Sequence, residues 1–194
     1  MNQDIILELY KNTDTVFSLK EISLLFPDLS YKALINKLSY AVKTGKLKKV
    51  RKGIYVKDNF DRLELANKLY TPSYISLETV LAKNGIIFQE YRNTIFAISY
   101  LTRRIKLASG EIFYRKIKDK ILLNGQGVER AGGCSVASKE RAFLDAVFLY
   151  KNYHFDNLKP LDWDKVKAVK NIYQSQTLEK RVEEYFKIYK HEYV

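Results

Sequence analysis

Cysteine and histidine are scarce in this chain of 194 residues, which has one cysteine, Cys134, and two histidines, His154 and His191. A single cysteine excludes an internal disulfide framework and any zinc site built from several thiolates. Two histidines leave little other material for binding a transition metal. We therefore expect no metal and no other cofactor.

Long apolar runs are also missing. No stretch approaches the roughly 20 apolar residues that are needed to cross a bilayer. The first residues, Met1 to Ile6, lack the basic and then apolar pattern of a secretory signal. The sequence predicts a soluble, cytoplasmic protein without membrane association.

Acidic residues are outnumbered, since 34 Lys and Arg stand against 22 Asp and Glu and give a formal net charge of +12. This surplus favours a polyanionic partner, either nucleic acid or an acidic protein surface. The excess is spread along the chain, so its local density is more informative than its sum. From Lys43 to Lys57 there are seven cations and no acid.

The first sixty residues carry the pattern of a winged helix-turn-helix domain. Apolar residues at helical spacing predict three helices, of which the second is capped by Ser18, with Glu21 three residues later. Ser30 caps the third helix and Gly45 ends it. Two short strands follow, with Gly53 at their turn, so that the order is helix, helix, turn, helix and basic hairpin.

The remaining sequence predicts a second domain, so the expected fold class is α+β: an N-terminal winged helix-turn-helix followed by a mixed domain with a small sheet and several helices. The expected domains are 1–60, a connecting helix and linker at 61–72, and 73–194. The pattern predicts helices at about 74–83 and 138–149, two more between 162 and 194, and strands at 94–101, 111–117 and 120–123.

DNA binding is the function that this order and charge placement favour. Base edges would be contacted from the outward side of the third helix, and phosphates from the basic hairpin. The residues predicted to bind DNA are Ser30, Tyr31, Lys32, Asn36, Lys37, Ser39, Lys43, Lys46, Lys48, Lys49, Arg51, Lys52 and Tyr55. The alternative is a solvated helix followed by a charged hairpin.

A second basic stretch falls on and between predicted strands, where its side chains could line one face of a sheet. It consists of Arg103, Arg104, Lys106, Arg115, Lys116 and Lys118, and is diluted by Glu111 and Asp119. A solvated sheet face is the simpler interpretation. The other is a docking surface for an acidic partner or a second DNA contact.

Catalytic patterns are weak, and we expect no enzymatic activity. The sequence has no phosphate-binding GK[ST] loop, and Gly125 and Gly127 lack the third glycine of a dinucleotide site. Cys134 and His154 could be imagined as nucleophile and base, although nothing in the sequence brings them together. Asp145, inside an apolar helix, could be a functional carboxylate or a helix-packing contact, and we favour the packing contact.

Several further motifs stand out, most of them in the second part of the chain. Residues 71–87 read TPSYISLETVLAKNGII, which resembles PSYISLESAL…GLI, a signature of the AbiE-type abortive-infection antitoxin family. Residues 136–145, VASKERAFLD, are similar to its helix start iAsPEKAllD, with Lys139 in place of the common proline. Residues 109–117 match a family strand between these motifs, and RKGIY at 51–55 matches a family wing.

The resemblance spans about residues 5–150 and implies a two-part transcriptional regulator of a type IV toxin–antitoxin system. The winged helix would bind double-stranded DNA in the promoter of its own operon, at the inverted repeats usual for such regulators, and repress it. The second domain would counter a neighbouring nucleotidyltransferase-type toxin, and a direct complex with that toxin is not implied.

Two alternatives come from other classes of protein. The first is an enzyme acting on nucleic acid, with the winged helix as its targeting module and Glu140, Asp145, Asp162 and Asp164 as its candidate acids. The second is a protein-interaction module without specific DNA binding, whose second basic stretch would hold an acidic partner.

Overall fold

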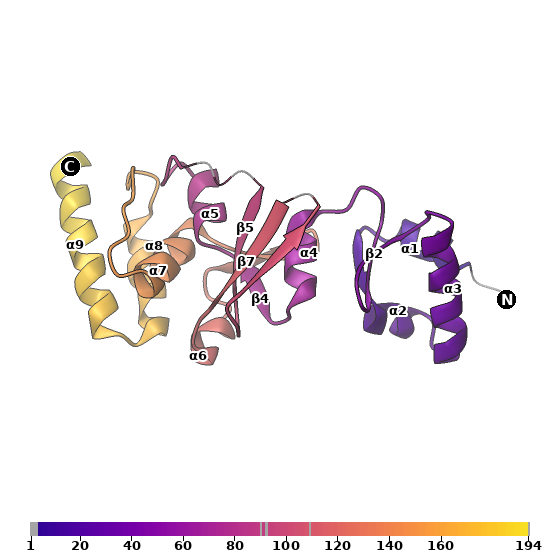
Figure 1. Cartoon of the computed structure of the whole chain (residues 1–194). Coiled ribbons are helices and arrows are strands. Elements are labelled where there is room, and N and C mark those ends of the chain that lie inside the picture. The colour runs from indigo at the N-terminus through magenta and orange to yellow at the C-terminus, as the bar shows by residue number, and fades with distance from the viewer. Residues whose placement is uncertain (1–3, 90, 92, 109, 194) are drawn as a thin grey trace. The chain divides into compact units, whose positions relative to one another are not determined.

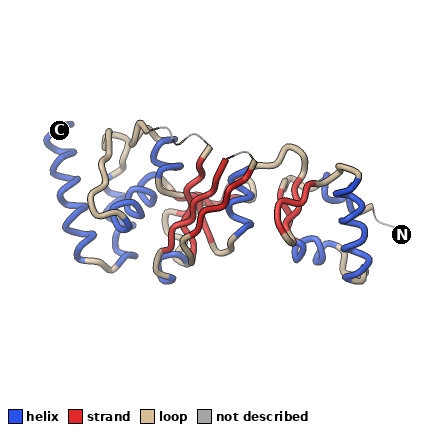
Figure 2. Tube along the Cα trace, in the orientation of Figure 1, coloured by secondary structure: helices blue, strands red, loops and turns tan. Residues whose placement is uncertain are grey.

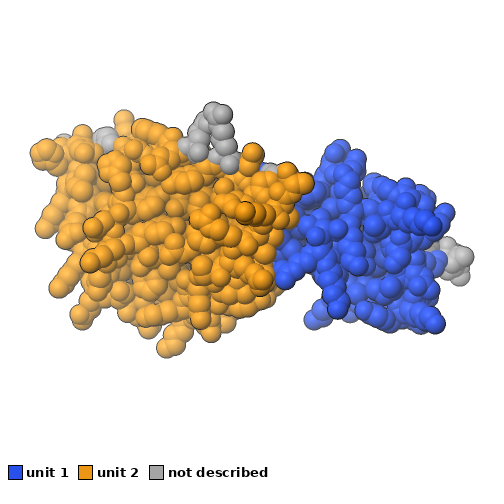
Figure 3. Space-filling view, in the orientation of Figure 1, with its two compact units in different colours: residues 1–69 blue, residues 70–194 orange. Residues whose placement is uncertain are grey.

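The computed structural model describes residues 4–89, 91, 93–108 and 110–193. The protein has a mixed α+β fold and divides into two compact units, Met1–Leu69 and Tyr70–Val194 (Figure 3). Each unit has its own sheet, as the red strands in Figure 2 show. The two units are described separately below.

Unit 1 combines four helices with a three-stranded antiparallel sheet among the residues described (Figure 1). The elements in chain order are α1 (Ile5–Lys11), β1 (Val16–Ser18), α2 (Leu19–Leu25), α3 (Tyr31–Lys43), β2 (Lys48–Arg51), β3 (Ile54–Val56) and α4 (Arg62–Leu69). The strand order in the sheet is β1-β3-β2.

The helix ends in unit 1 lie where the capping residues predict them. The Ser18 hydroxyl accepts from the backbone N–H of Glu21, and the Glu21 carboxylate accepts from the backbone N–H of Ser18, which completes a capping box at α2. The Ser30 hydroxyl caps α3 in the same manner. Gly45 follows the end of α3 with a φ of +72°, a left-handed conformation that favours glycine.

The core of unit 1 is formed by the inward faces of α1, α2 and α3 against the sheet. Leu34, Leu38 and Ala41 of α3 are buried in this cluster, as the helical spacing predicts. Val42 is partly buried against the same cluster. One face of α3 is thereby fixed to the core, and the opposite face is left to solvent.

Helix α4 belongs to unit 1, although the sequence analysis placed it in a connecting segment at 61–72. The buried carboxylate of Glu64 accepts hydrogen bonds from the backbone N–H groups of Thr15 (2.9 Å) and Val16 (3.1 Å) and from the Thr15 hydroxyl (2.6 Å). The Lys68 ammonium donates to the carboxylates of Asp14 (3.0 Å) and Glu21 (2.9 Å). These bonds fasten α4 to β1 and to α2.

Unit 2 is built on a six-stranded mixed sheet with the order β6-β7-β5-β4-β9-β8. Its strands are β4 (Ser73–Ile75), β5 (Thr94–Ser99), β6 (Arg103–Leu107), β7 (Gly110–Lys116), β8 (Val128–Ala131) and β9 (Cys134–Ala137). Two of the pairings are parallel, β5 with β7 and β4 with β9.

The helices of unit 2 pack around α7 (Lys139–Leu149), which the Ser138 hydroxyl caps as predicted. The others are α5 (Glu78–Lys83), α6 (Asp119–Leu122), α8 (Trp163–Lys170), the 3-10 turn η1 (Asn171–Tyr173) and α9 (Gln176–Tyr193). Helix α7 contacts α5, α8 and α9. In Figure 1, α7, α8 and α9 lie on one side of the larger sheet.

Two predicted elements of unit 2 are wrong. The helix expected at 74–83 begins only at Glu78, because Ser73–Ile75 form strand β4 between β5 and β9. The strand expected at 120–123 is the short helix α6. Strands β1, β6, β8 and β9 were not predicted. They are three to five residues long, and each is held by pairing with another strand, either one distant in sequence or the other strand of a hairpin.

No helix within the described ranges combines the length and the apolar character that crossing a bilayer requires.

Candidate nucleic-acid interface

Twelve of the thirteen residues predicted to bind DNA have exposed side chains. They are Ser30, Tyr31, Lys32, Asn36, Lys37, Ser39, Lys43, Lys46, Lys48, Lys49, Arg51 and Lys52. The first seven lie on α3 or its cap, and the other five lie on the connection to β2, on β2 and at the turn before β3. The fold therefore leaves this set open to a large ligand.

Tyr55 is the exception, because it is buried and cannot contact DNA directly as predicted. Its side chain is only 3% exposed and forms part of the apolar core of unit 1. Burial raises the pKa of Tyr55, and so does the nearby Tyr31 hydroxyl. The Lys49 ammonium lies 6.0 Å from the centre of the Tyr55 ring. Tyr55 therefore belongs to the core beneath the exposed set, with Tyr31 of α3 and Lys49 of β2 near its ring.

The hairpin between β2 and β3 is short and is tied to α2. Gly53 turns the chain with a φ of +78°, and its carbonyl accepts from the Leu19 N–H at 2.7 Å. A bulge between Lys49 and Arg51 shifts the register of β2 against β3. Lys48 pairs with Asp58 at 2.5 Å, but both side chains are well exposed, so this ion pair contributes little stability and can exchange for a phosphate.

Sequence reasoning missed one residue of the exposed face of α3. Tyr40 is 66% exposed and lies one helical turn beyond Asn36, on the side away from the buried Leu34, Leu38 and Ala41. The sequence signal was its spacing of four residues from Asn36, but the predicted outward side of the helix did not include Tyr40.

The second basic stretch does not form one row. Neighbouring residues in a strand point to opposite faces of a sheet, and β6 and β7 pair in register, so its cations are divided. One face carries Arg104, Lys106 and Arg115, the other carries Arg103 and Lys116, and Lys118 immediately precedes α6. The prediction that these residues line a single sheet face is wrong.

Two of these cations also have partners within unit 2. The Arg104 guanidinium lies 2.9 Å from the Glu111 carboxylate and 4.1 Å from the centre of the Phe113 ring. The Arg115 guanidinium lies 4.8 Å from the centre of the Tyr150 ring. These contacts account for both arginines without an external partner.

Asp145, the strongest candidate for a catalytic acid, is enclosed in a polar network in the core of unit 2. It is fully buried and accepts hydrogen bonds from the hydroxyls of Tyr74 (3.2 Å), Ser76 (2.7 Å) and Tyr173 (2.7 Å). The Arg141 Nε lies 3.4 Å from it, and the other guanidinium nitrogens donate to the Tyr74 hydroxyl and to two backbone carbonyls.

Burial raises the pKa of Asp145, while Arg141 acts in the opposite direction. The network is shut off from solvent and fixes α7 to β4 and to the turn η1 through side chains on all three. This geometry supports the helix-packing interpretation of Asp145.

The other candidate acids also have local partners. The Asp162 carboxylate caps α8 by accepting from the N–H groups of Asp164 and Lys165. Glu140 is buried and accepts from the Asp162 N–H, and Asp164 pairs with Lys167 on the surface. Cys134 is buried, whereas His154 is exposed next to Asp156.

One buried acid in unit 2 is less well satisfied. Glu78, the first residue of α5, is 5% exposed, and its Oε2 has no hydrogen-bond partner among the described residues. Burial raises the pKa of Glu78, opposed by the Tyr150 and Tyr153 hydroxyls and by Arg115. The preceding Leu77 has a φ of +54°, a strained conformation for a branched residue. No sequence pattern predicted that Glu78 would be buried beside Tyr150, Tyr153 and Arg115.

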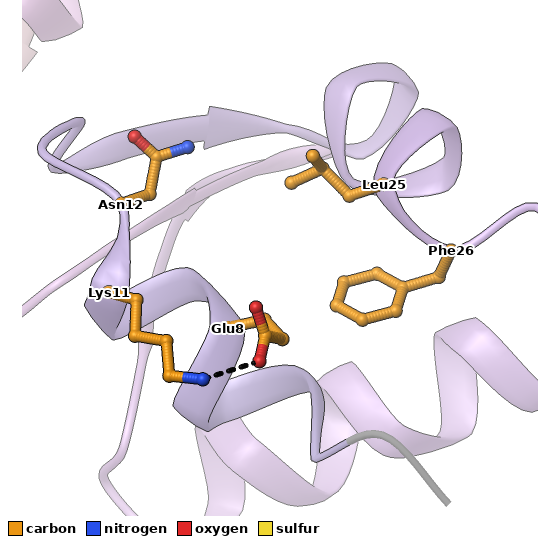
Figure 4. Close-up of a pocket in the computed structure, with 5 residues that line it drawn as sticks. All are labelled: Glu8, Lys11, Asn12, Leu25 and Phe26. Carbon is orange, nitrogen blue, oxygen red and sulfur yellow. Dashed lines mark hydrogen bonds and ion pairs between the residues drawn. The ribbon is translucent and has the colours of Figure 1, made fainter. Parts of the chain in front are cut away.

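A cavity of about 280 Å³ lies in unit 1 between α1 and the end of α2 (Figure 4). It is lined by Glu8, Lys11, Asn12, Leu25 and Phe26. Its one acid and one base pair with each other at 2.9 Å. The cavity is at the small end for ligand pockets, and its lining offers no converging polar groups beyond this pair.

Comparisons with known proteins give no family for this chain: no protein-family model matches it, and no curated protein matches it. Within the described part of the chain, no three His, Cys, Asp or Glu side chains gather into a group that could hold a metal ion.

Proposed function

We propose that this protein is a DNA-binding transcriptional regulator whose unit 1 is a winged helix-turn-helix domain. The chain order of α1, β1, α2, α3, β2 and β3, together with the sheet order β1-β3-β2, supports this assignment. Helix α3 would lie in the major groove, and the turn between β2 and β3 would act as the wing against the phosphates.

The observation that carries the proposal is an exposed basic segment, residues 31–52, whose Lys48 pairs with the exposed Asp58 outside the segment. Residues 31–52, from the start of α3 to the turn before β3, hold eight cations and no acid, and the side chains of all eight are exposed. Each phosphate that such a surface neutralises releases counterions, which gives strong and salt-dependent affinity.

The regulatory setting follows from the resemblance to AbiE-type antitoxins: repression of the protein's own operon and opposition to a nucleotidyltransferase-like toxin. The two strongest motifs, 71–87 and 136–145, adjoin in unit 2. Strands β4 and β9 pair in parallel, and Tyr74 and Ser76 donate to Asp145. This contact supports treating both motifs as one structural unit. Growth of cells that express the neighbouring gene, with and without this protein, tests the antitoxin role.

The experiment for DNA binding is charge reversal of the hairpin. Replacing Lys48, Lys49, Arg51 and Lys52 by Glu should weaken binding to the DNA upstream of the gene by about a hundredfold or more. The slope of log K against log salt concentration should fall by about 3 to 4, because each lost phosphate contact removes about 0.9. The circular dichroism spectrum should be unchanged, since all four side chains are exposed.

A matched control changes the net charge by the same amount elsewhere. Lys151, Lys159, Lys180 and Lys187 are exposed residues of unit 2, and their replacement by Glu should leave the salt slope near that of the wild type. Equal losses of affinity in both quadruple variants would mean that net charge, and not this surface, determines binding, and would refute the proposal.

A further inference from the structure

The outward side of α3 carries a strip of four side chains at successive helical turns. Lys32, Asn36, Tyr40 and Lys43 are spaced four, four and three residues apart, and all four are exposed. A cation stands at each end of the strip, with an amide and an aromatic ring between them. The helix that carries the strip has three lysines and no acid.

The two central side chains are not engaged by the residues that the structure describes. Neither the Asn36 amide nor the Tyr40 hydroxyl makes a hydrogen bond, an ion pair or a ring contact within the described part of the chain. Tyr10, another exposed tyrosine of unit 1, differs in this respect, because its hydroxyl donates to the Lys46 carbonyl at 2.9 Å. The strip therefore presents an amide and a large ring whose bonding capacity is unused by the fold.

The chemistry of these two groups matches an A·T base pair better than a G·C base pair. A carboxamide can bond adenine through N7 and the N6 amino group together, and an aromatic ring can pack against the methyl group of thymine. Residues one turn apart are separated by about 6 Å along a helix, and successive base pairs by about 3.4 Å. Asn36 and Tyr40 can therefore reach base pairs one or two steps apart.

We propose that Asn36 and Tyr40 are the specificity-determining residues of α3 and that they read adjacent A·T pairs in the major groove. Asn36 bonds the edge of an adenine, and Tyr40 contacts the methyl group of a thymine. Lys32 and Lys43 hold phosphates on either side and contribute affinity without sequence preference. This inference rests on the proposed DNA-binding function.

The test combines base analogues with variants of the full-length protein. A duplex is first selected from a random library for tight binding by the wild-type chain. Each adenine is then replaced in turn by 7-deazaadenine, which lacks the N7 acceptor, and each thymine by uracil, which lacks the methyl group. Affinities are measured for the wild type and for Asn36→Ala, Tyr40→Ala and, as a control, Asn59→Ala, an exposed asparagine outside α3.

For the wild type, 7-deazaadenine at one position should weaken binding about tenfold, within the range for a bidentate base contact. Asn36→Ala should bind the unmodified duplex about as weakly as the wild type binds the modified one. Its affinity should not change when that adenine is replaced by 7-deazaadenine. Uracil at a neighbouring thymine should weaken wild-type binding severalfold and leave Tyr40→Ala unaffected. Asn59→Ala should behave as the wild type in every arm.

The outcomes separate this inference from the function on which it rests. If no duplex is enriched and none is bound, the proposed function fails. If a duplex is enriched and bound tightly, but both α3 variants keep the wild-type response to the analogues, then only the assignment of Asn36 and Tyr40 is overturned. Melting curves of the variants should match the wild type, because neither side chain contributes to the core.

Discussion

At the scale of single residues, two of the buried carboxylates of unit 2, Asp145 and Glu78, have different environments. Asp145 has hydroxyl donors and an arginine around it, so that its charge is compensated where it is buried. Glu78 has a carboxylate oxygen without a hydrogen-bond partner. An incompletely satisfied buried acid lowers stability whenever it is ionised.

Because the pKa of Glu78 is raised in the folded protein, we expect the stability of the fold to depend on pH. The folded protein holds the Glu78 proton more tightly than the unfolded chain does, for which the pKa is 4.5. Stability from this group is therefore present below pH 4.5 and is lost as the pH rises through the folded-state pKa. Glu78→Gln, which stays neutral, should melt at a higher temperature than the wild type at pH 7, and the difference should vanish near pH 4.

Thermal melts between pH 4 and 8 measure this difference. Glu179→Gln, at an exposed position of α9, removes the same charge without burial and should show no such trend. A melting difference for Glu78→Gln that stays constant with pH would contradict the account of Glu78 as a buried acid with a raised pKa.

At the scale of elements, local signals were sufficient for the three helices that begin after a serine cap, α2, α3 and α7. Ser18, Ser30 and Ser138 each cap the helix that the sequence assigned to them, because a cap and the apolar spacing after it lie within a few residues. Strand β4 was not predicted, because its three residues, Ser73–Ile75, continue into an apolar run whose spacing also fits a helix. Its extended conformation depends on pairing with β5 and β9, which no local pattern reports.

We expect the hydrogen bonds that Glu64 of helix α4 accepts to stabilise unit 1. Glu64→Ala removes the acceptor for the backbone N–H groups of Thr15 and Val16 and should destabilise unit 1 by about 2 to 4 kcal/mol, since an unpaired buried donor costs about 1 to 3 kcal/mol. Hydrogen exchange followed by mass spectrometry should show faster exchange at residues 14–25 of the full-length variant.

Peptides from unit 2 serve as the internal control and should keep their wild-type exchange rates. Glu64→Gln retains a carbonyl oxygen as an acceptor and should have a smaller effect than Glu64→Ala. Unchanged exchange at residues 14–25 in Glu64→Ala would mean that α4 is not an integral part of unit 1.

At the scale of the whole molecule, the chain is a basic protein of two compact units, and in unit 1 residues 31–52 hold eight exposed cations and no acid. The exposed surface of α3 and β2 could be predicted from sequence, because helical spacing separates inward from outward residues. The same spacing extends to Tyr40, whereas the burial of Tyr55 depends on which side of its short strand meets the core. The division of the second basic stretch between two faces required the register of β6 and β7.

The central claim is that unit 1 recognises a particular DNA sequence, and fluorescence anisotropy tests it most directly. The purified protein is titrated onto the duplex from upstream of its gene and onto a scrambled duplex of the same composition, at several salt concentrations. The account predicts a preference for the native duplex of about a thousandfold at physiological salt. Equal and steeply salt-dependent affinity for both duplexes would contradict it and leave a basic protein that binds DNA without specificity.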